Sequence, residues 1–264
     1  MFIIGELLNG MYKKVGEALI KKDAAAIQDL ARAQIAAGAD ALDLNCGPVS
    51  RNQLEDMRWL IETVQEVTHK AVVIDSSKPR VIADVIAYAK NGVIINSTTA
   101  DREKLEVLVP VARDKGCGLI ALAMDKKGVP QNKDQRLELA ATILAFCQDN
   151  NFPFEKLYLD PVVMPVDCAQ AQLKEVIETI REFKSLSDPA PQTVVGLSNV
   201  SQGMDDRSLV NRVFLIMAQE AGLDAAILDP LDNALMNEMI TAELILNKQI
   251  YCKAYLEAFR KSKA

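Results

Sequence analysis

Eight short apolar segments recur along this chain at intervals of roughly 30 residues, and helix-forming segments lie between them. The segments are rich in β-branched residues or continuously apolar, which is typical of strands covered on both faces. The predicted strands span residues 2–5, 41–45, 71–75, 93–97, 118–124, 157–160, 193–198 and 225–229. Such an alternation predicts a parallel sheet, either a closed barrel or an open doubly wound sheet.

The predicted helices have clear start and stop residues. Asp23 precedes a helix over 24–37 that ends at Gly38, and Asp101 precedes a helix over 102–114 that ends before Gly116. Asp134 is expected to open the helix that follows the fifth strand. Further helices are predicted over 168–187, 207–221, 232–247 and 251–261, the last packed on the outside.

Two features favour the closed barrel over the open sheet. The strand count is eight at near-even spacing, and no strand is followed by a glycine-rich dinucleotide fingerprint. The length of 264 residues suits a barrel, which typically takes roughly 250. No linker rich in Pro, Gly or Ser divides the chain. We therefore expect an α/β fold, a single (β/α)8 TIM barrel formed by one domain over residues 1–264.

The charge balance excludes some classes of partner. Lys and Arg number 30 against 36 Asp and Glu, for a net charge of -6, whereas nucleic acid or an anionic membrane calls for a basic face. No apolar run approaches the ~20 residues of a membrane span. The five cysteines are scattered without a CxxC pair, as expected of reduced thiols. With no charged segment before an apolar run at the start, we expect a cytoplasmic protein.

Barrel enzymes carry their chemistry at the carboxyl ends of the strands. Here carboxylates and carboxamides dominate those positions. They include Glu6 and Asn9 after the first strand, Asp43 and Asn45 in the second, Asp75 in the third, Asn96 in the fourth, Asp160 in the sixth, Ser198, Asn199 and Gln202 at the seventh, and Asp229 at the eighth. The only histidine, His69, belongs to the opposite end of the barrel, so catalysis by histidine is excluded.

Other chemistries fit these positions less well. Lys78 and Lys126 follow the strands in loops, whereas a Schiff-base lysine should point into the barrel. The His and Cys ligands of a catalytic zinc are missing, and we expect no metal. Calcium or magnesium at an acidic loop stays an alternative.

The polar strand ends suit a pterin ring. A pterin presents a guanidine-like edge, and an ionised Asp accepts two parallel N–H bonds from such an edge, while Asn can donate and accept elsewhere. Asp75, Asn96 and Asp160 lie on the third, fourth and sixth strands, near enough around a barrel mouth to bind one flat heterocycle. Each residue alone could cap a helix or satisfy a loop, but together they predict a binding site.

The most specific motif is GLSNVS at 196–201, accompanied by IIGE at 3–6, LDLN at 42–45, INST at 95–98 and LYLDP at 157–161. GLDAA at 222–226 and LNKQIYC at 246–252 add to them. With these motifs the chain resembles the methyltetrahydrofolate:corrinoid/iron–sulfur protein methyltransferases, related in fold to dihydropteroate synthases and to the folate module of cobalamin-dependent methionine synthase. The likeness runs from Met1 to about Phe259.

The resemblance implies that Asp75, Asn96 and Asp160 hold the pterin of methyltetrahydrofolate or tetrahydrofolate and that Asn199 is catalytic near N5. It places Ser198, Gln202 and Arg207 in folate binding, the last two further along the ligand, with Glu6, Asn9, Asp43 and Asn45 as additional rim residues. It implies a corrinoid (cobalamin) carried by a partner protein, and a homodimer. Leu7 stands where the family usually has Arg, which leaves the identity of the corrinoid partner open.

Alternative functions remain at this point. The same enzyme type can run from methylcorrinoid to tetrahydrofolate in a demethylase system. A dihydropteroate synthase binds a pterin in the same fold, but its pyrophosphate substrate calls for basic residues where this chain has the acidic run 229–232. A non-catalytic folate-binding barrel would bind pterin without turnover.

Overall fold

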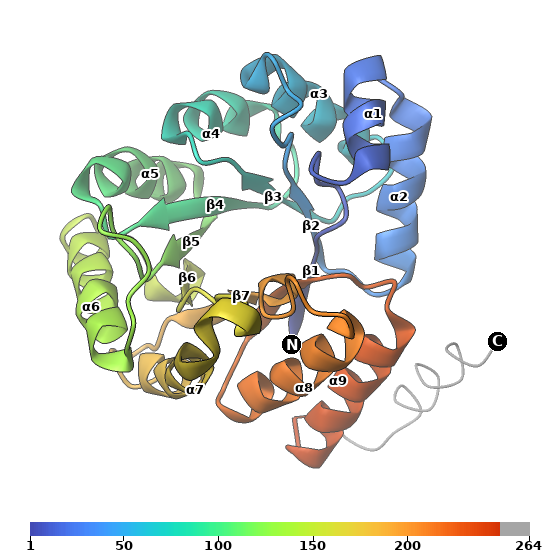
Figure 1. Ribbon diagram of the computed structural model, residues 1–264. Helices are drawn as coiled ribbons and strands as arrows, with labels where there is room; N and C mark the ends of the chain where they lie inside the picture. Colours follow the sequence, from blue (N-terminus) through green and yellow to red (C-terminus); the bar gives the residue numbers. More distant parts are fainter. Residues whose placement is uncertain (249–264) are drawn as a thin grey trace.

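The eight strands of the chain form one closed parallel barrel in the order β1-β2-β3-β4-β5-β6-β7-β8. This is seen in the computed structural model, which describes residues 1–248. Figure 1 looks into the ring of strands, with helices around its outside. The predicted TIM barrel is thus confirmed. The predicted helix over 251–261 and the end of the 246–252 motif lie outside the described residues.

The strand bounds agree closely with the predicted ones. The strands are β1 Phe2–Gly5, β2 Ala41–Leu44, β3 Ala71–Asp75, β4 Val93–Thr99, β5 Gly118–Leu122, β6 Leu157–Asp160, β7 Gln192–Gly196 and β8 Ala225–Leu228. The largest difference concerns the seventh strand, which stops at Gly196 because Leu197–Asn199 turn into a 3-10 helix, η3. The turn directs Ser198 and Asn199 across the end of the barrel.

The helices that surround the barrel are α1 Lys13–Lys21, α2 Ala24–Ala36, α3 Gln53–Gln65, α4 Pro79–Val85, α5 Arg102–Lys115, α6 Lys133–Asp149, α7 Val166–Phe183, α8 Arg207–Glu220 and α9 Asn233–Ile245, with 3-10 turns η1 Ile86–Tyr88 and η2 Phe154–Lys156. Residues 1–248 contain no helix with the length and apolarity that a membrane crossing needs.

Three helix starts test the capping residues that were predicted from the sequence. Asp23 caps α2 as predicted, because its carboxylate accepts from the Ala26 amide. The prediction that Asp134 opens α6 is wrong, because Asn132 occupies the cap and accepts from the Gln135 amide. Asp101 stands at the predicted position but makes no capping bond, since its carboxylate accepts from Thr99 Oγ1 and the Lys126 amide instead.

The barrel interior is filled from one end by apolar side chains. They form a cluster separate from the larger core between sheet and helices, and its buried members are Ile4, Ala41, Val73, Ile94, Ile120, Val194 and Ala225. Side chains two residues apart on a strand share a face. Residues two positions further along these strands therefore also face inward, at the carboxyl end of the barrel, which we call the mouth.

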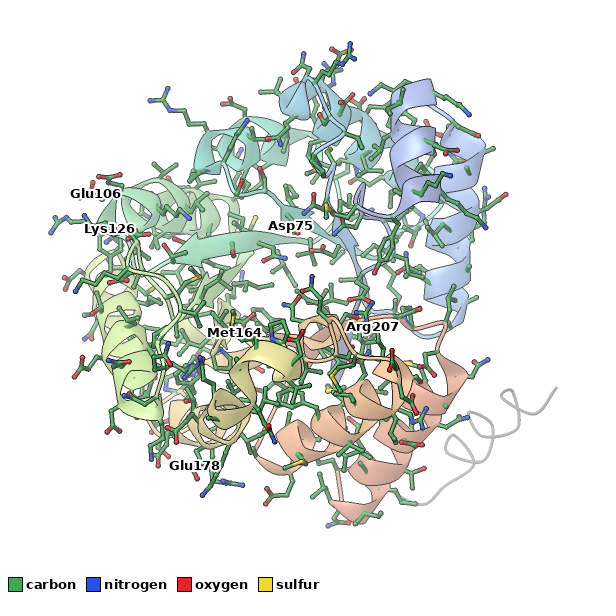
Figure 2. All side chains as sticks on the ribbon, viewed as in Figure 1. Asp75, Glu106, Lys126, Met164, Glu178 and Arg207 are labelled. Carbon is green, nitrogen blue, oxygen red and sulfur yellow. The ribbon has the colours of Figure 1, made fainter. Side chains whose placement is uncertain are left out.

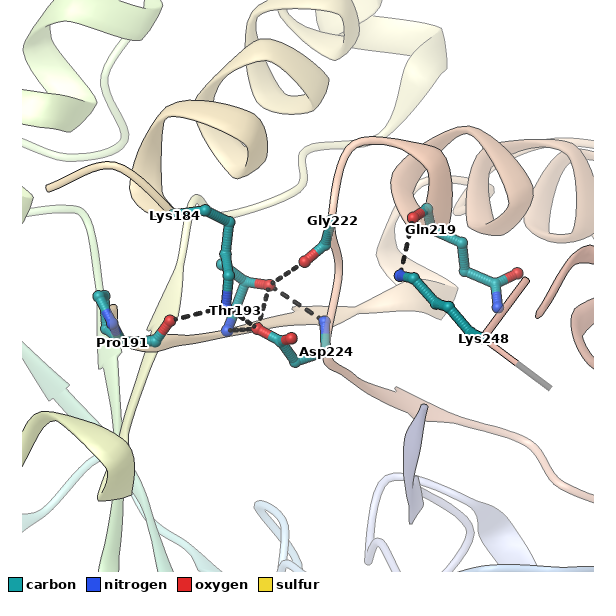
Figure 3. Close-up of polar contacts among 7 residues, drawn as sticks. All are labelled: Lys184, Pro191, Thr193, Gln219, Gly222, Asp224 and Lys248. Carbon is teal, nitrogen blue, oxygen red and sulfur yellow. Dashed lines mark hydrogen bonds and ion pairs between the residues drawn. The ribbon is translucent and has the colours of Figure 1, made fainter. Parts of the chain in front are cut away.

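The opposite end, here called the floor, carries a polar network between the starts of β7 and β8 (Figure 3). Asp224 accepts from Lys184 Nζ at 2.7 Å and from the Thr193 amide and hydroxyl at 2.8 and 3.0 Å. Lys184 Nζ also donates to the Pro191 carbonyl at 3.0 Å. All of these groups belong to chain segments entering the two strands, so the network fixes the strand starts.

Candidate active site

The predicted pterin residues lie at the mouth of the barrel because of the two-residue repeat of the strands. Val73, Ile94 and Tyr158 contribute to the inner apolar cluster, and Asp75, Asn96 and Asp160 follow each of them two residues later. Asp75 is paired directly with Asn96 in the register of β3 and β4. In Figure 2, Asp75, Met164 and Arg207 lie around the mouth, whereas Glu106 and Glu178 lie on the outer helices.

Strand β2 contributes two further side chains that contact the predicted pterin residues. Asn45 Nδ2 donates to Asp75 Oδ2 at 2.6 Å, and Asn45 Oδ1 accepts from the Gly47 amide at 2.6 Å. Asn96 Nδ2 donates to Asp43 Oδ1 at 3.0 Å. This last bond crosses from β4 to β2, because alternate strands of a barrel supply side chains to the same interior layer.

The carboxyl groups of this cluster are hard to ionise. Burial, and next the nearby Asp75 carboxylate, raise the pKa of Asp43 well above its usual range, although the bond from Asn96 opposes this. Burial raises the pKa of Asp75 to about 6, against the hydrogen bond from Asn45. Asp43 is only 3% exposed, and no cation of residues 1–248 opposes this shift of its pKa.

Asp160 stands on the other side of the mouth in a different environment. Its Oδ1 accepts from the Val162 amide at 2.7 Å. Burial raises the pKa of Asp160 to about 7, while the Val162 bond and the positive charge of Arg136 lower it. Arg136 is fully buried, and its Nε donates to the Pro161 carbonyl at 2.8 Å. A buried cation thus supports the loop that follows Asp160.

A second group of polar residues gathers where β1, β7 and β8 end. Glu6 Oε1 accepts from Ser198 Oγ at 2.6 Å and from Tyr12 Oη at 3.4 Å. Arg207 Nη2 donates to the Ser198 carbonyl at 2.9 Å. Burial raises the pKa of Glu6, with a further contribution from the carboxylate of Asp229. These side chains line a cavity of about 260 Å³.

Asn199 and Gln202 are exposed beside this second group. Within residues 1–248 the Asn199 amide group has no hydrogen-bond partner. Gly196 makes room for it, because a Cβ on that glycine would stand 3.0 Å from Asn199 Nδ2. The carboxamide is therefore free to donate to a ligand at the mouth.

Asn9, the remaining predicted rim residue, organises backbone. Its Oδ1 accepts from the Met11 amide at 2.9 Å, and its main chain forms a parallel bridge with Asn45. A cavity of about 350 Å³ lies beside this bridge, lined in part by Asn45, Cys46 and Asp75. Asn9 thus shapes the wall of the mouth.

The structure therefore divides the predicted residues into two groups. One group consists of two hydrogen-bonded pairs on strands β2 to β4, Asp43 with Asn96 and Asn45 with Asp75. The other combines Glu6, Ser198 and Arg207. Among residues 1–248, the side chains of Asn9, Asp160, Asn199 and Gln202 make no hydrogen bond to either group.

Two residues of the site were not predicted. Tyr12 precedes α1 with no motif to mark it, and Arg136 sits in the first turn of α6, where arginine is usually solvated. Within residues 1–248 no three His, Cys, Asp or Glu side chains group in a way that could hold a metal ion.

Comparison with known families identifies the class of protein. The family described as pterin binding enzyme matches residues 5–229, which is most of the chain. The chain therefore belongs to the pterin-binding enzymes. Within this class it is 31% identical to methylcorrinoid:tetrahydrofolate methyltransferase of Eubacterium limosum, over 100% of this chain and 97% of that protein.

More distant relatives share parts of this likeness. Methionine synthase of Mycobacterium leprae is 29% identical over 86% of this chain, which corresponds to 20% of that much longer protein. Two solved dihydropteroate synthases share the fold. The protein from Coxiella burnetii has a TM-score of 0.66 at 14% identity, covering 92% of this chain and 93% of that one. The protein from Yersinia pestis has a TM-score of 0.67 at 16% identity, covering 94% of each.

Proposed function

We propose that this pterin-binding enzyme is a methyltransferase that moves the N5 methyl group between a reduced folate and the cobalt of a corrinoid protein, with the pterin held by Asp75, Asn96 and Asp160. The observation that carries the proposal is the set of three inward polar side chains above an apolar interior. The full-length similarity to a methylcorrinoid:tetrahydrofolate methyltransferase supports the same reaction.

We assign the action on N5 to Asn199. In transfer from methyltetrahydrofolate the N5–CH3 bond breaks, the methyl group passes to cobalt(I), and N5 takes up a proton. An amide nitrogen without a partner can donate a hydrogen bond to N5 as negative charge develops there. Such a donor acts mainly in the transition state, so Asn199 serves turnover more than folate binding.

Both directions of transfer use the same site, because a catalyst lowers the two barriers together. The relative from Eubacterium limosum is named for transfer from methylcorrinoid to tetrahydrofolate, which supports this direction for the present enzyme. The corrinoid brings the methyl group or receives it at cobalt, so the enzyme needs no nucleophile of its own. In this direction N5 of tetrahydrofolate takes the methyl group, the carbon–cobalt bond breaks to leave cobalt(I), and the proton of N5 passes to solvent at the open mouth.

Asn199→Ala tests the catalytic assignment. Transfer is followed as the decay of Co(I) cobalamin with methyltetrahydrofolate, and in reverse as the loss of methylcobalamin with tetrahydrofolate. The variant is expected to lose on the order of 10²–10³ in kcat while folate binding changes little. Asn237→Ala, on helix α9, is the control. Folate binding by the wild type without transfer in either direction, even with a corrinoid protein present, would show a non-catalytic barrel.

The corrinoid protein is proposed to dock on the loops that surround the mouth, residues 7–11, 125–131 and 203–206. Met11 is 70% exposed there, next to Tyr12 at 43%. Exposed large apolar side chains beside an active site are favourable contacts for a protein that must bring its cofactor to that site.

The structure offers little to a pyrophosphate substrate of the dihydropteroate synthase kind. The cavity at the end of β8 is lined by Glu6, Asp229 and Asp232, and Arg207 is the only cation that residues 1–248 contribute to it. Three acids repel an anion more than one arginine attracts it. The two solved synthases therefore support the fold of this chain and not its reaction.

We infer that the enzyme is a homodimer built on α7 and α8. Leu209, Val213 and Met217 on α8 are each about half exposed, and with Ile216 they line a groove of about 780 Å³. Its rim carries Lys174, Arg181, Glu178 and Glu220, equal numbers of each charge, which suits a two-fold contact with a second copy.

Light scattering after size exclusion tests the dimer. The wild type is expected to be dimeric, Val213→Glu monomeric, and Ile20→Glu on α1 dimeric as the control. A monomeric wild type would contradict the dimer and leave the catalytic proposal intact.

The four described cysteines are free thiols, which supports a cytoplasmic location.

A further inference from the structure

Strand β2 stands beside β3, which carries Asp75, and two strands from Asn96 on β4. Asp43 and Asn45 follow the inward Ala41 at two-residue intervals, so both point toward the barrel axis. Each makes one hydrogen bond to a residue assigned above to the pterin, Asp43 to Asn96 and Asn45 to Asp75. The two β2 side chains therefore contact the proposed pterin residues directly.

Asn45 has its amide orientation fixed by the backbone. The Gly47 N–H can only donate, so the atom of Asn45 that faces it must be the oxygen, and the two are 2.6 Å apart. The Asn45 NH₂ group is then directed at Asp75 Oδ2. Asp75 Oδ1 has no partner within residues 1–248 and is not sealed from solvent, so it is available to a ligand.

Asp43 orients Asn96 as Asn45 orients Asp75, but here the strand β2 residue accepts the hydrogen bond. Its Oδ1 accepts from Asn96 Nδ2, and this is the only hydrogen bond that the Asp43 side chain makes among the described residues. The Asn96 oxygen is thereby turned away from Asp43. It has no partner among residues 1–248 and is not sealed from solvent, so it faces the mouth as an acceptor.

We propose that Asp43 and Asn45 are positioning residues: Asp43 holds the Asn96 amide with its oxygen toward the ligand, and Asn45 holds the Asp75 carboxylate with one oxygen free. The mouth then offers three acceptor atoms, Asp75 Oδ1, Asn96 Oδ1 and Asp160 Oδ2, for the N–H groups of one heterocycle. A ring rich in donors, such as a reduced pterin, is selected by this pattern. The inference rests on the proposed folate site.

Without these positioning residues the acceptor pattern is lost. If Asp43 were replaced by an apolar residue, the Asn96 amide could rotate and direct its NH₂ group at the ligand's own N–H groups. The mismatch leaves two donors facing each other in a confined site, which costs binding more than it costs the chemical step. The effect is therefore expected in the dissociation constant and KM rather than in kcat.

The experiment measures tetrahydrofolate binding by calorimetry and KM and kcat by methyl transfer, on the full chain. Asp43→Leu keeps the side-chain size and removes the acceptor, and we expect the dissociation constant and KM to rise about 10- to 100-fold with kcat lowered less than about threefold. Asp43→Asn keeps an oxygen acceptor at the same position and is expected to recover most of the loss. Asp84→Leu, the same change at an exposed position of α4, is the control.

A double-mutant cycle separates positioning from general packing. In an Asn96→Ala background Asp43→Leu should add less than about a twofold loss of binding, because the group it positions is absent. If Asp43→Leu does not fold, Asn45→Ala tests the other pair, with Asp75→Asn as its background.

Full additivity in these cycles, or equal binding by Asp43→Leu and Asp84→Leu, would overturn the inference while leaving folate binding established. Absence of tetrahydrofolate binding by the wild type would overturn the proposed function, and this inference with it.

Discussion

Both ends of the barrel carry aspartates, but the hydrogen-bond donors around these aspartates differ between the two ends. At the floor Asp224 receives three donors, from the Lys184 ammonium and from the amide and hydroxyl of Thr193. At the mouth the side chains of Asp75 and Asp160 each receive a single donor from the part of the chain that the structure describes. At the floor the three donors, one of them a lysine ammonium, converge on Asp224 Oδ2 and tie two chain segments together, whereas the oxygens of Asp75 and Asp160 that have no donor lie at the mouth, where a ligand can reach them.

The mouth aspartates are hard to ionise. Burial raises the pKa of Asp75 to about 6 and that of Asp160 to about 7, because few donors offset the loss of solvent. The mouth thus holds carboxylates that cost stability in the unliganded protein, and a ligand with several N–H groups would supply the missing donors. Residues that oppose stability without a ligand are frequent at binding sites.

Asp160→Asn is the variant that tests most directly whether the aspartates of the mouth serve ligand binding rather than stability. An asparagine directs an NH₂ group toward the ligand after satisfying the Val162 amide, so tetrahydrofolate binding is expected to weaken about 10- to 100-fold. The unliganded variant should be more stable than the wild type at pH 8, by about 1 kcal/mol or more, since no buried charge remains. Calorimetric titration and thermal unfolding measure the two effects. Unchanged binding together with lower stability would make Asp160 a structural residue.

The pH dependence of tetrahydrofolate binding tests whether the mouth aspartates bind the ligand in their ionised form. The ionised forms of Asp75 and Asp160 accept N–H groups best, so tetrahydrofolate binding should tighten on the order of tenfold between pH 6 and pH 8. Stability of the unliganded protein changes in the opposite sense. A raised pKa in the folded state means that these groups favour folding below pH 4 and lose this contribution as the pH rises through 6 to 7.

Binding measured by calorimetry across this range, with Asp160→Asn alongside, separates the two groups. The variant should retain only the part of the pH dependence centred near 6. A wild-type profile that is flat from pH 6 to pH 8 would show that neither carboxylate needs to ionise for binding.

A substitution at the floor is expected to have the smallest effect on the proposed folate site. Lys184→Met removes one of the three donors to Asp224 and should lower the free energy of unfolding by about 1 kcal/mol, or the melting temperature by about 2–4 °C. Tetrahydrofolate binding should change less than about twofold, because the floor and the mouth lie at opposite ends of the strands. Weakened folate binding at unchanged stability would show that the two ends are coupled.

The sequence by itself determined the barrel and the position of the pterin residues along it. Eight apolar segments at even spacing leave few other folds, and the end of a strand such as 71–75 or 157–160 must lie at the mouth of a parallel barrel. Local signals did less well where several polar residues compete, as at Asn132 and Asp134, where the true cap precedes the predicted one.

Only the tertiary structure decided which polar groups face each other. Asp43 and Asn96 are 53 residues apart and lie on strands that are not neighbours, yet they share one interior layer of the closed barrel. Arg136 is fully buried under the loop after Asp160, although nothing in its helix distinguishes it from a surface arginine. Strand periodicity is a local property of the chain, whereas side-chain pairing across a barrel depends on tilt, register and closure, which arise only when all eight strands are assembled.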